Sequence, residues 1–278
     1  MRWLLNRFGI YPNAYYNYLK NRKAERIEMK KKVLKEIEEI YHEHKGVDGY
    51  RRIKVYLERR GIYLSNLTVF KYMKELKLKS ITRRKKMPYK KGSSHKVFEN
   101  VLNQKFEAEK INEKWVIDFT YLYLKDGSVH YNCTILDLYD RSVVASKTAK
   151  NITSELAINT VKAALKNQGK AIKNLLLHSD RGSQFTSKEF TKFCEQMKIK
   201  QSMSRAGCPF DNSPMERYFN TLKTELIYLH VYQRKEQLYE AVQNFAYIFY
   251  NHVRPHSYNK FKTPFQARIL RHVCYNFA

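Results

Sequence analysis

Apolar residues over the first 80 positions recur at helical spacing within a strongly charged sequence. Residues 25–44 place Val33, Ile37, Ile40 and Tyr41 at intervals that bring these side chains onto one face of a helix. The other side chains of this segment are mostly charged. The pattern therefore predicts an amphipathic helix.

Two shorter helices are predicted after this segment. The first contains Val55, Tyr56 and Leu57 and ends at Gly61, and Ser65 is suited to cap the second. Two short helices joined by a glycine-containing turn are typical of a helix-turn-helix that binds DNA. The basic side chains expected to contact DNA are Arg51, Arg52, Lys71 and Lys74. A small helical bundle with solvated charges explains the same pattern.

The pattern changes after a basic stretch. Residues 81–105 are interpreted as a linker, because their like charges repel one another and Pro88 and Gly92 disfavour a helix. Extended segments are then predicted at about 114–124, 129–138 and 142–149.

Helices and strands alternate over the rest of the chain. The expected elements are a helix that carries Leu156, Val161 and Leu165, a buried strand over 175–178, a helix over 187–198, a strand over 200–203, and helices over 213–228 and 234–250. Three antiparallel strands followed by this alternation predict a mixed α/β domain.

The net positive charge of the chain indicates which class of molecule it binds. The chain has 53 Lys and Arg against 26 Asp and Glu, a formal net charge of +27, and residues 1–110 alone carry 29 basic and 12 acidic side chains. An excess of this size indicates a polyanion such as nucleic acid, with a basic ribosomal or membrane-surface protein as the alternative. Hydrophobic residues at 43% exclude a disordered basic tail.

The four cysteines, Cys133, Cys194, Cys208 and Cys274, have no paired spacing. They indicate a reducing cytosol and argue against a zinc module. The sequence also lacks a long apolar run and a convincing signal peptide. We expect a soluble intracellular protein with no membrane partner.

Three acidic residues suggest the chemistry. Asp118 lies inside an apolar run, Asp180 ends another, and 35 residues separate Asp180 from Glu216. A strand interior disfavours Asp, because the carboxylate loses water there and gains no partner in the sheet. Carboxylates suit hard ions such as Mg²⁺, and two ions about 3.5–4 Å apart can activate the attacking oxygen and stabilise the leaving oxygen at a phosphodiester. The pattern favours a metal-dependent enzyme that acts on nucleic acid.

Two of these residues also have structural interpretations. Asp180 can form a turn with Gly182, since Asp bonds its own backbone and Gly accepts positive φ. Glu216 fits a capping box with Ser213 at the N-cap and Pro214 at the first helical position. Asp118 has no such local explanation.

The surrounding motifs resemble those of a known family. They are Trp115–Tyr121, His178–Thr186, Ser202–Ser213, Glu216–Glu225, and Tyr250–His256 followed by Thr263 and Pro264. In this order they resemble the catalytic core of retroviral integrases and insertion-sequence transposases, the D-D-35-E group. Within that group the chain is similar to the second-frame protein of the third-numbered insertion-sequence family. It departs at Cys208, where relatives often have Asn.

The resemblance implies a fold and a reaction. The fold is a ribonuclease-H-like α/β core, a mixed five-stranded sheet with flanking helices, preceded by a small all-α helix-turn-helix-like domain. The implied divisions are a helical DNA-binding region over 1–80, a linker over 81–105, a catalytic core over 106–230 and a helical extension over 231–278. Asp118, Asp180 and Glu216 would bind two Mg²⁺ ions, with Mn²⁺ expected to substitute, for DNA cleavage at element ends and strand transfer.

The resemblance also implies partners. These are the terminal repeats of the element, target DNA, further copies of the chain on DNA, and an upstream-frame protein with a helix-turn-helix and a leucine zipper. A location at the nucleoid in the bacterial cytoplasm follows. The alternatives are a ribonuclease-H-like nuclease and a non-catalytic DNA-binding regulator.

Helical and strand periodicity extend the candidate site. Glu216, Asn220 and Lys223 share one face of a helix, so Asn220 and Lys223 are expected to contact DNA, with a solvated lysine as the alternative. His178 shares the strand face of Asp180, where it either contacts the scissile phosphate or packs. The loop over 205–212 is expected to be mobile.

Overall fold

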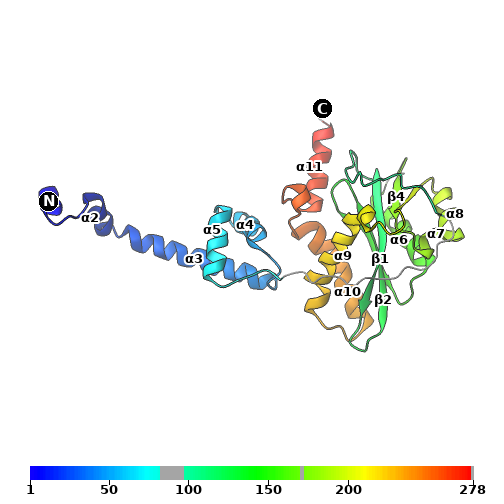
Figure 1. Cartoon of the computed structure of the whole chain (residues 1–278), viewed down its shortest axis with the longest axis horizontal. Coiled ribbons are helices and arrows are strands. Elements are labelled where there is room, and N and C mark those ends of the chain that lie inside the picture. The colour runs from blue at the N-terminus through cyan, green and yellow to red at the C-terminus, as the bar shows by residue number, and fades with distance from the viewer. Residues whose placement is uncertain (82–96, 170–171, 277–278) are drawn as a thin grey trace. The chain divides into compact units, whose positions relative to one another are not determined.

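The computed structural model describes residues 1–81, 97–169 and 172–276, and leaves the side chains of 22–23 and 271–276 undescribed. The chain divides into two compact units, Met1–Thr82 and Arg83–Ala278 (Figure 1). Most of the predicted linker over 81–105 lies outside the described residues.

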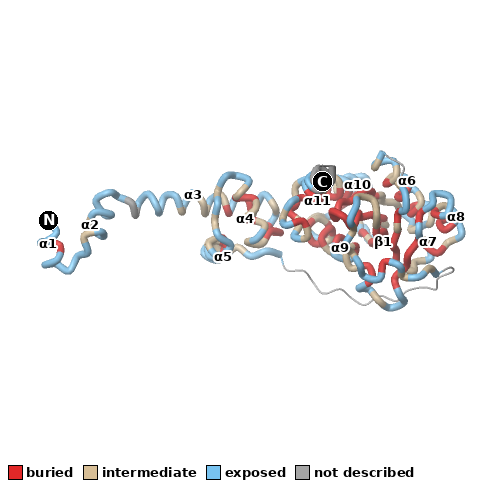
Figure 2. Tube along the Cα trace, turned by 90° about the horizontal axis from the view of Figure 1, so that it is seen from above, coloured by how far each residue is buried: buried red, intermediate tan, exposed pale blue. Residues whose placement is uncertain are grey.

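The first unit is all helical. Its helices are α1 (Arg2–Arg7), α2 (Pro12–Leu19), α3 (Arg22–Glu43), α4 (Tyr50–Arg59) and α5 (Asn66–Glu75). Burial is concentrated in α4, α5 and the adjoining end of α3 (Figure 2), where Ile37, Ile53 and Val69 share one core. Gly61 has a φ of +79° after α4, and the Ser65 hydroxyl accepts a hydrogen bond from the Thr68 amide at 3.1 Å. Both helix boundaries predicted from the sequence are confirmed.

The second unit is built on a five-stranded mixed sheet. Its strands are β1 (Lys114–Tyr123), β2 (Val129–Asp137), β3 (Val143–Ala149), β4 (Leu176–Ser179) and β5 (Lys200–Met203). Their order is β3-β2-β1-β4-β5, with β1, β2 and β3 antiparallel and β4 and β5 parallel to β1. The predicted strands agree with these bounds to within one or two residues.

Helices cover both faces of this sheet (Figure 1). On one face lie α6 (Ser154–Gln168), α7 (Ser183–Thr186) and α8 (Lys188–Gln196), and on the other lie α9 (Ser213–Glu225), α10 (Lys235–Gln243) and the π-helix Asn244–Val253. Because side chains alternate along a strand, Trp115 and Ile117 enter the first core, while Val116 and Leu122 enter the core shared with α9.

The C-terminal helices belong to the same compact unit as the sheet. Leu238 of α10 and Phe245 of the π-helix share a core with Val116 of β1. The side chain of Asn251 accepts from the Val143 amide at 2.9 Å and donates to the Val143 carbonyl at 3.0 Å. The helical extension expected over 231–278 therefore lies in the same compact unit as the sheet.

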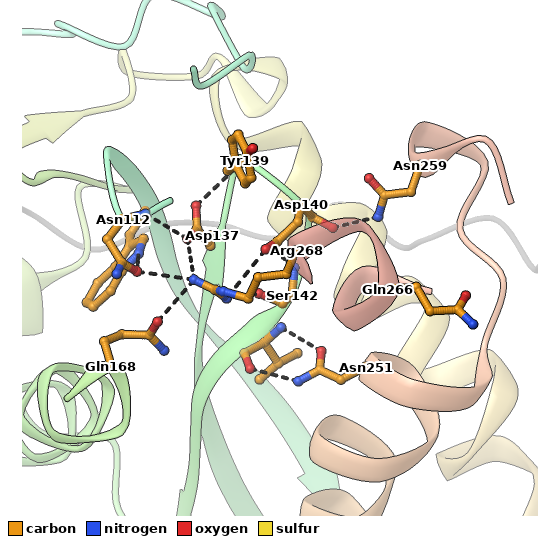
Figure 3. Close-up of polar contacts among 12 residues, drawn as sticks. Asn112, Asp137, Tyr139, Asp140, Ser142, Gln168, Asn251, Asn259, Gln266 and Arg268 are labelled. Carbon is orange, nitrogen blue, oxygen red and sulfur yellow. Dashed lines mark hydrogen bonds and ion pairs between the residues drawn. The ribbon is translucent and has the colours of Figure 1, made fainter. Parts of the chain in front are cut away.

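A buried polar cluster fastens the last helix, α11 (Pro264–Asn276), to the end of β2 (Figure 3). The Arg268 guanidinium lies 3.0 Å from Asp137 Oδ2 and 3.5 Å from Asp140 Oδ2, and donates to the Ser142 hydroxyl at 2.6 Å. Both carboxylates are fully buried. Burial first, and then the nearby Asp140, raises the pKa of Asp137 to about 7.

Asp137→Asn should remove a pH dependence of folding. The pKa of Asp137 is higher in the folded protein than the value of about 3.9 in an unfolded chain. Its contribution to stability is therefore full below about pH 4 and is lost as the pH rises through 7. Urea unfolding from pH 5 to 8 should show that the wild type loses stability relative to Asp137→Asn as the pH rises, by at most about 1.4 kcal/mol per pH unit.

Asp126→Asn is the matched control. Hydrogen bonds from Ser128 lower the pKa of this exposed turn residue, so it titrates below the tested window. Parallel pH profiles for the wild type and Asp137→Asn would contradict the expected effect.

Candidate active site

The pairing of β1 with β4 brings two of the three acidic residues to the same level of the sheet. Val116 is opposite His178 in this parallel pair, and Asp118 and Asp180 each lie two residues further along. Asp118 is in the middle of β1, and Asp180 directly follows the last residue of β4. Asp118 on β1 and Asp180, directly after β4, therefore occupy neighbouring positions on adjacent segments of the sheet.

Asp118 lies on the sheet face that α9 covers. Val116 and Leu122, at even-numbered positions of β1 like Asp118, pack with Met215 and Phe219 of α9. Asp118 itself is only partly buried, and its Oδ1 accepts from the Phe119 amide at 2.7 Å. The buried Thr134 of β2 lies opposite Asp118 in the register, so Asp118 adds a carboxylate to a face that carries both apolar and polar side chains.

Asp180 forms a turn. Its Oδ1 accepts from the Gly182 amide at 2.8 Å, as the structural interpretation of this residue predicts. The expected reason for the glycine is wrong, because Gly182 has a φ of −61°. A Cβ at this position would come within 2.9 Å of Asp180 Oδ1 and 2.7 Å of Gln184 Nε2, so a larger residue would require these two side chains to move.

Glu216 lies in the first turn of α9 and does not form the predicted capping box. The helix already includes Ser213, with φ −52° and ψ −38°, and the N-cap residue is Asn212, which makes no side-chain cap hydrogen bond. The Ser213 hydroxyl instead donates to the Phe210 carbonyl at 2.5 Å. Within the described part of the chain, the exposed Glu216 carboxylate has neither a hydrogen bond nor an ion pair.

The three carboxylates match Mg²⁺ in donor chemistry, since this hard ion prefers carboxylate and water oxygens. The strand register supports the match for Asp118 and Asp180, and the exposed Glu216 has no competing partner in the described chain. Among residues 1–81, 97–169 and 172–276, no three His, Cys, Asp or Glu side chains are grouped closely enough to hold a metal ion. The structure thus aligns the two aspartates without assembling a closed ligand set.

His178 is fully buried beneath this site. Its Nδ1 lies 2.9 Å from the Ser202 hydroxyl and its Nε2 3.1 Å from the Ser204 hydroxyl. Burial lowers the pKa of His178 to about 4, so the ring is neutral near pH 7. These contacts support the packing interpretation of His178 and not a contact with DNA.

Asn220 and Lys223 lie on α9 and are both partly exposed. They follow Glu216 by four and seven residues, which brings them to the same side of the helix. The Thr224 hydroxyl donates to Asn220 Oδ1 at 3.5 Å.

The loop over 205–212 is hydrogen-bonded to the rest of the unit through Asp211, and its expected mobility stays a prediction. It contains a 3₁₀ turn, Pro209–Asn212, and the fully buried Asp211 accepts from Arg205, Asn100 and Gln104. Two of these partners lie more than 100 residues away in the sequence. No local signal could have identified them.

In the first unit, three of the four residues predicted to contact DNA are exposed, and the fourth forms an ion pair within the protein. Arg51, Lys71 and Lys74 are exposed. Arg52 instead forms an ion pair at 2.8 Å with the buried Asp48. Its charge is therefore partly neutralised within the protein.

The chain matches three family models. Two of them, both described as an integrase core domain, match residues 108–209 and 197–264, and one described as an HTH-like domain matches residues 28–86. The last match supports the helix-turn-helix interpretation of α4 and α5 over a simple helical bundle.

Relatives match over most of the chain. It is 31% identical over 252 residues to the 31 kDa protein of insertion element IS600 from Shigella sonnei, covering 90% of this chain and 92% of the relative. It is 33% identical over 236 residues to the putative transposase InsK of IS150 from Escherichia coli K12, covering 85% and 82%. A solved HTLV-2 integrase catalytic core in complex with magnesium is 24% identical, with a TM-score of 0.45 over 56% of this chain and 95% of that one.

The two integrase-core matches and the transposase relatives define an integrase-core protein, a polynucleotidyl transferase. The chain belongs to the IS3 family of insertion-sequence transposases. The resemblance inferred from the sequence, the ribonuclease-H-like fold class and the transposase function are confirmed. Across the described residues, no helix has the length and apolar character needed to cross a membrane.

His178→Ala should affect stability and not DNA affinity. The substitution removes the buried partner of two serine hydroxyls, so the free energy of unfolding should fall by about 1–3 kcal/mol. Urea unfolding and a DNA-binding titration on the same sample separate the two effects. Unchanged stability with weaker DNA binding would instead place His178 at the DNA.

Proposed function

We propose that this transposase cleaves DNA at the ends of its insertion element and joins those ends to target DNA, with Asp118, Asp180 and Glu216 as its catalytic residues. The observation that carries the proposal is the β1–β4 register, which aligns Asp118 with Asp180 beneath α9. The unpartnered Glu216, at the start of that helix, completes the proposed set.

The three carboxylates would hold two Mg²⁺ ions, with Mn²⁺ as a substitute. When bound, such a pair activates the attacking oxygen and stabilises the leaving oxygen of a phosphodiester. Water attacks the phosphodiester at the element end and displaces a 3′-hydroxyl. This hydroxyl then attacks a phosphodiester of the target, forms a new bond to its phosphorus and displaces the target's 3′-oxygen as a free 3′-hydroxyl. Each step is an in-line displacement, so no covalent enzyme intermediate is required.

The first unit supplies most of the DNA affinity in this proposal. Arg51, Lys71 and Lys74 are exposed and would meet phosphates, while Arg52 forms an ion pair with Asp48. On the catalytic unit, Asn220 and Lys223 follow Glu216 along α9, where they would contact the DNA end. Lysine suits this role, because its compact charge needs no bidentate geometry.

We further propose the partners and the location that the family suggests. The chain would bind the terminal repeats of its element as a homo-oligomer and act with, or fused to, an upstream-frame protein at the bacterial nucleoid. A plain ribonuclease-H-like nuclease is disfavoured by the HTH-like unit, and a non-catalytic regulator by the presence of all three acidic residues.

Asp118→Asn, Asp180→Asn and Glu216→Gln should each abolish cleavage and strand transfer of labelled element ends in Mg²⁺. The amides keep the shape of each side chain but remove the charge that a divalent ion needs. Glu216→Gln should also fold normally, because Glu216 caps nothing. Asp126→Asn, an exposed turn variant of the same unit, should keep wild-type activity, and substantial cleavage by any triad variant would remove that residue from the set.

DNA binding should weaken steeply with salt, because each neutralised phosphate contributes roughly −0.9 to the slope of log affinity against log salt. Arg51→Ala, Lys71→Ala and Lys74→Ala should each reduce the magnitude of that slope by up to about one. Arg52→Ala should mainly destabilise the first unit, since it leaves Asp48 buried without its arginine.

Lys200→Ala, at an exposed position on the edge strand β5, is the control and should leave the slope unchanged. Filter binding over a range of salt concentrations provides the measurement. Slopes that match the wild type in all three first-unit variants would refute their assignment to DNA.

A further inference from the structure

Asp211, in the loop before α9, is a buried carboxylate with several hydrogen-bond donors, and none of the roles proposed above uses it. It is fully buried. Its Oδ1 accepts from Gln104 Nε2 at 2.8 Å and Arg205 Nη2 at 3.1 Å, and its Oδ2 accepts from Asn100 Nδ2 at 2.8 Å, the Arg205 amide at 2.9 Å and Arg205 Nε at 3.1 Å. The hydrogen bonds from Arg205 hold the pKa of Asp211 well below its usual range. Asp211 is therefore charged at working pH.

These bonds join the loop before α9 to the segment 97–106, here called the edge segment. The edge segment runs beside the edge strand β5, where the Met203 amide donates to the Glu99 carbonyl at 3.2 Å. The Leu102 amide donates to the Ser202 hydroxyl at 3.1 Å, and the Leu102 side chain is buried in the core that α9 shares. The edge segment is thus fixed to the sheet independently of Asp211.

The hydrogen bonds of Asp211 to Asn100, Gln104 and Arg205, here called the Asp211 anchor, lie close to Glu216 along the chain. Asp211 lies five residues before Glu216, and α9 begins two residues after it. The rest of α9 is held by Phe219 and Leu222 in the core. Glu216 itself makes no hydrogen bond or ion pair within the described chain, so only the helix sets its position.

The number of hydrogen-bond donors in the Asp211 anchor requires a carboxylate at this position. Five N–H donors converge on two acceptor oxygens, and both oxygens are used. Asparagine has one acceptor oxygen and would turn an N–H₂ group toward donors, leaving several buried groups unsatisfied. A neutral amide therefore cannot replace the anchor.

We propose that Asp211 is a positioning residue for the reaction: by tying the loop over 205–212 to the edge segment, it fixes the start of α9 and so the place of Glu216 relative to Asp118 and Asp180. The proposal rests on the proposed function of Glu216. Asp211 touches neither metal nor DNA in this role and acts only through Glu216.

Asp211→Asn in the full-length chain tests the proposal directly. The kcat for cleavage of an element end should fall, on the order of 100-fold, because a small misplacement of a reacting group has an effect of this size. The KM for DNA should stay unchanged, and the Mg²⁺ concentration for half-maximal rate should rise. Asp126→Asn, the same substitution in an exposed turn, should change none of these values. A purely structural role would lower the amount of folded enzyme without moving the Mg²⁺ requirement.

Gln104→Ala keeps the proposal testable if Asp211→Asn fails to fold. It removes one donor from the edge segment and leaves the charge pair of Asp211 with Arg205 in place. It should lower kcat several-fold and raise the Mg²⁺ requirement in the wild-type background. It should have no further effect in an Asp211→Asn background, because the two changes break the same anchor.

The outcomes separate this proposal from the proposed function. Wild-type kcat and Mg²⁺ requirement in folded Asp211→Asn, or in Gln104→Ala if the former does not fold, overturn the positioning role. If Glu216→Gln is inactive in the same assay, the catalytic triad survives that result. If Glu216→Gln is active, the proposed function fails, and the positioning role of Asp211 fails with it.

Discussion

The parallel pairing of β1 with β4 is the constraint on which the candidate active site depends. The pairing is short, with Val116 opposite His178 at its end, and it sets the level at which Asp180 leaves the sheet. A shift of one residue would turn Asp180 toward the opposite face of the sheet, because side chains alternate along a strand. His178 helps to hold β4 in place, since its buried ring lies between the hydroxyls of Ser202 and Ser204.

The two faces of the sheet differ: one is covered by α6, α7 and α8, and the other carries the candidate site. One face is closed by α6, α7 and α8 over a hydrophobic core that includes Trp115 and Ile117. The other face carries α9, and here the partly exposed carboxylate of Asp118 lies opposite the buried Thr134. The C-terminal helices complete this second face, and the Arg268 cluster with Asp137 and Asp140 fastens the last of them to β2. The helices that pack on this face therefore both stabilise the fold and position the residues of the candidate site.

Local signals in the sequence predicted local features well. The strands, the Ser65 cap and the glycine after α4 depend on neighbouring residues, and the structure confirms them. The capping box at Glu216 is wrong because the 3₁₀ turn before α9 lets the helix begin one residue earlier, at Ser213. The contacts of Asp211 with Asn100 and of Asp137 with Arg268 join residues more than 100 positions apart, so no spacing rule could find them. The register of β1 and β4 likewise depends on the packed sheet.

Anomalous diffraction from a complex of the full-length chain with an element-end DNA and Mn²⁺ would locate the metal relative to Asp118 and Asp180. The alignment of Asp118 with Asp180 predicts Mn²⁺ peaks coordinated by both aspartates, with Glu216 from α9 completing the ligands. Mn²⁺ bound at other side chains, with the scissile phosphate away from Asp118 and Asp180, would contradict the account.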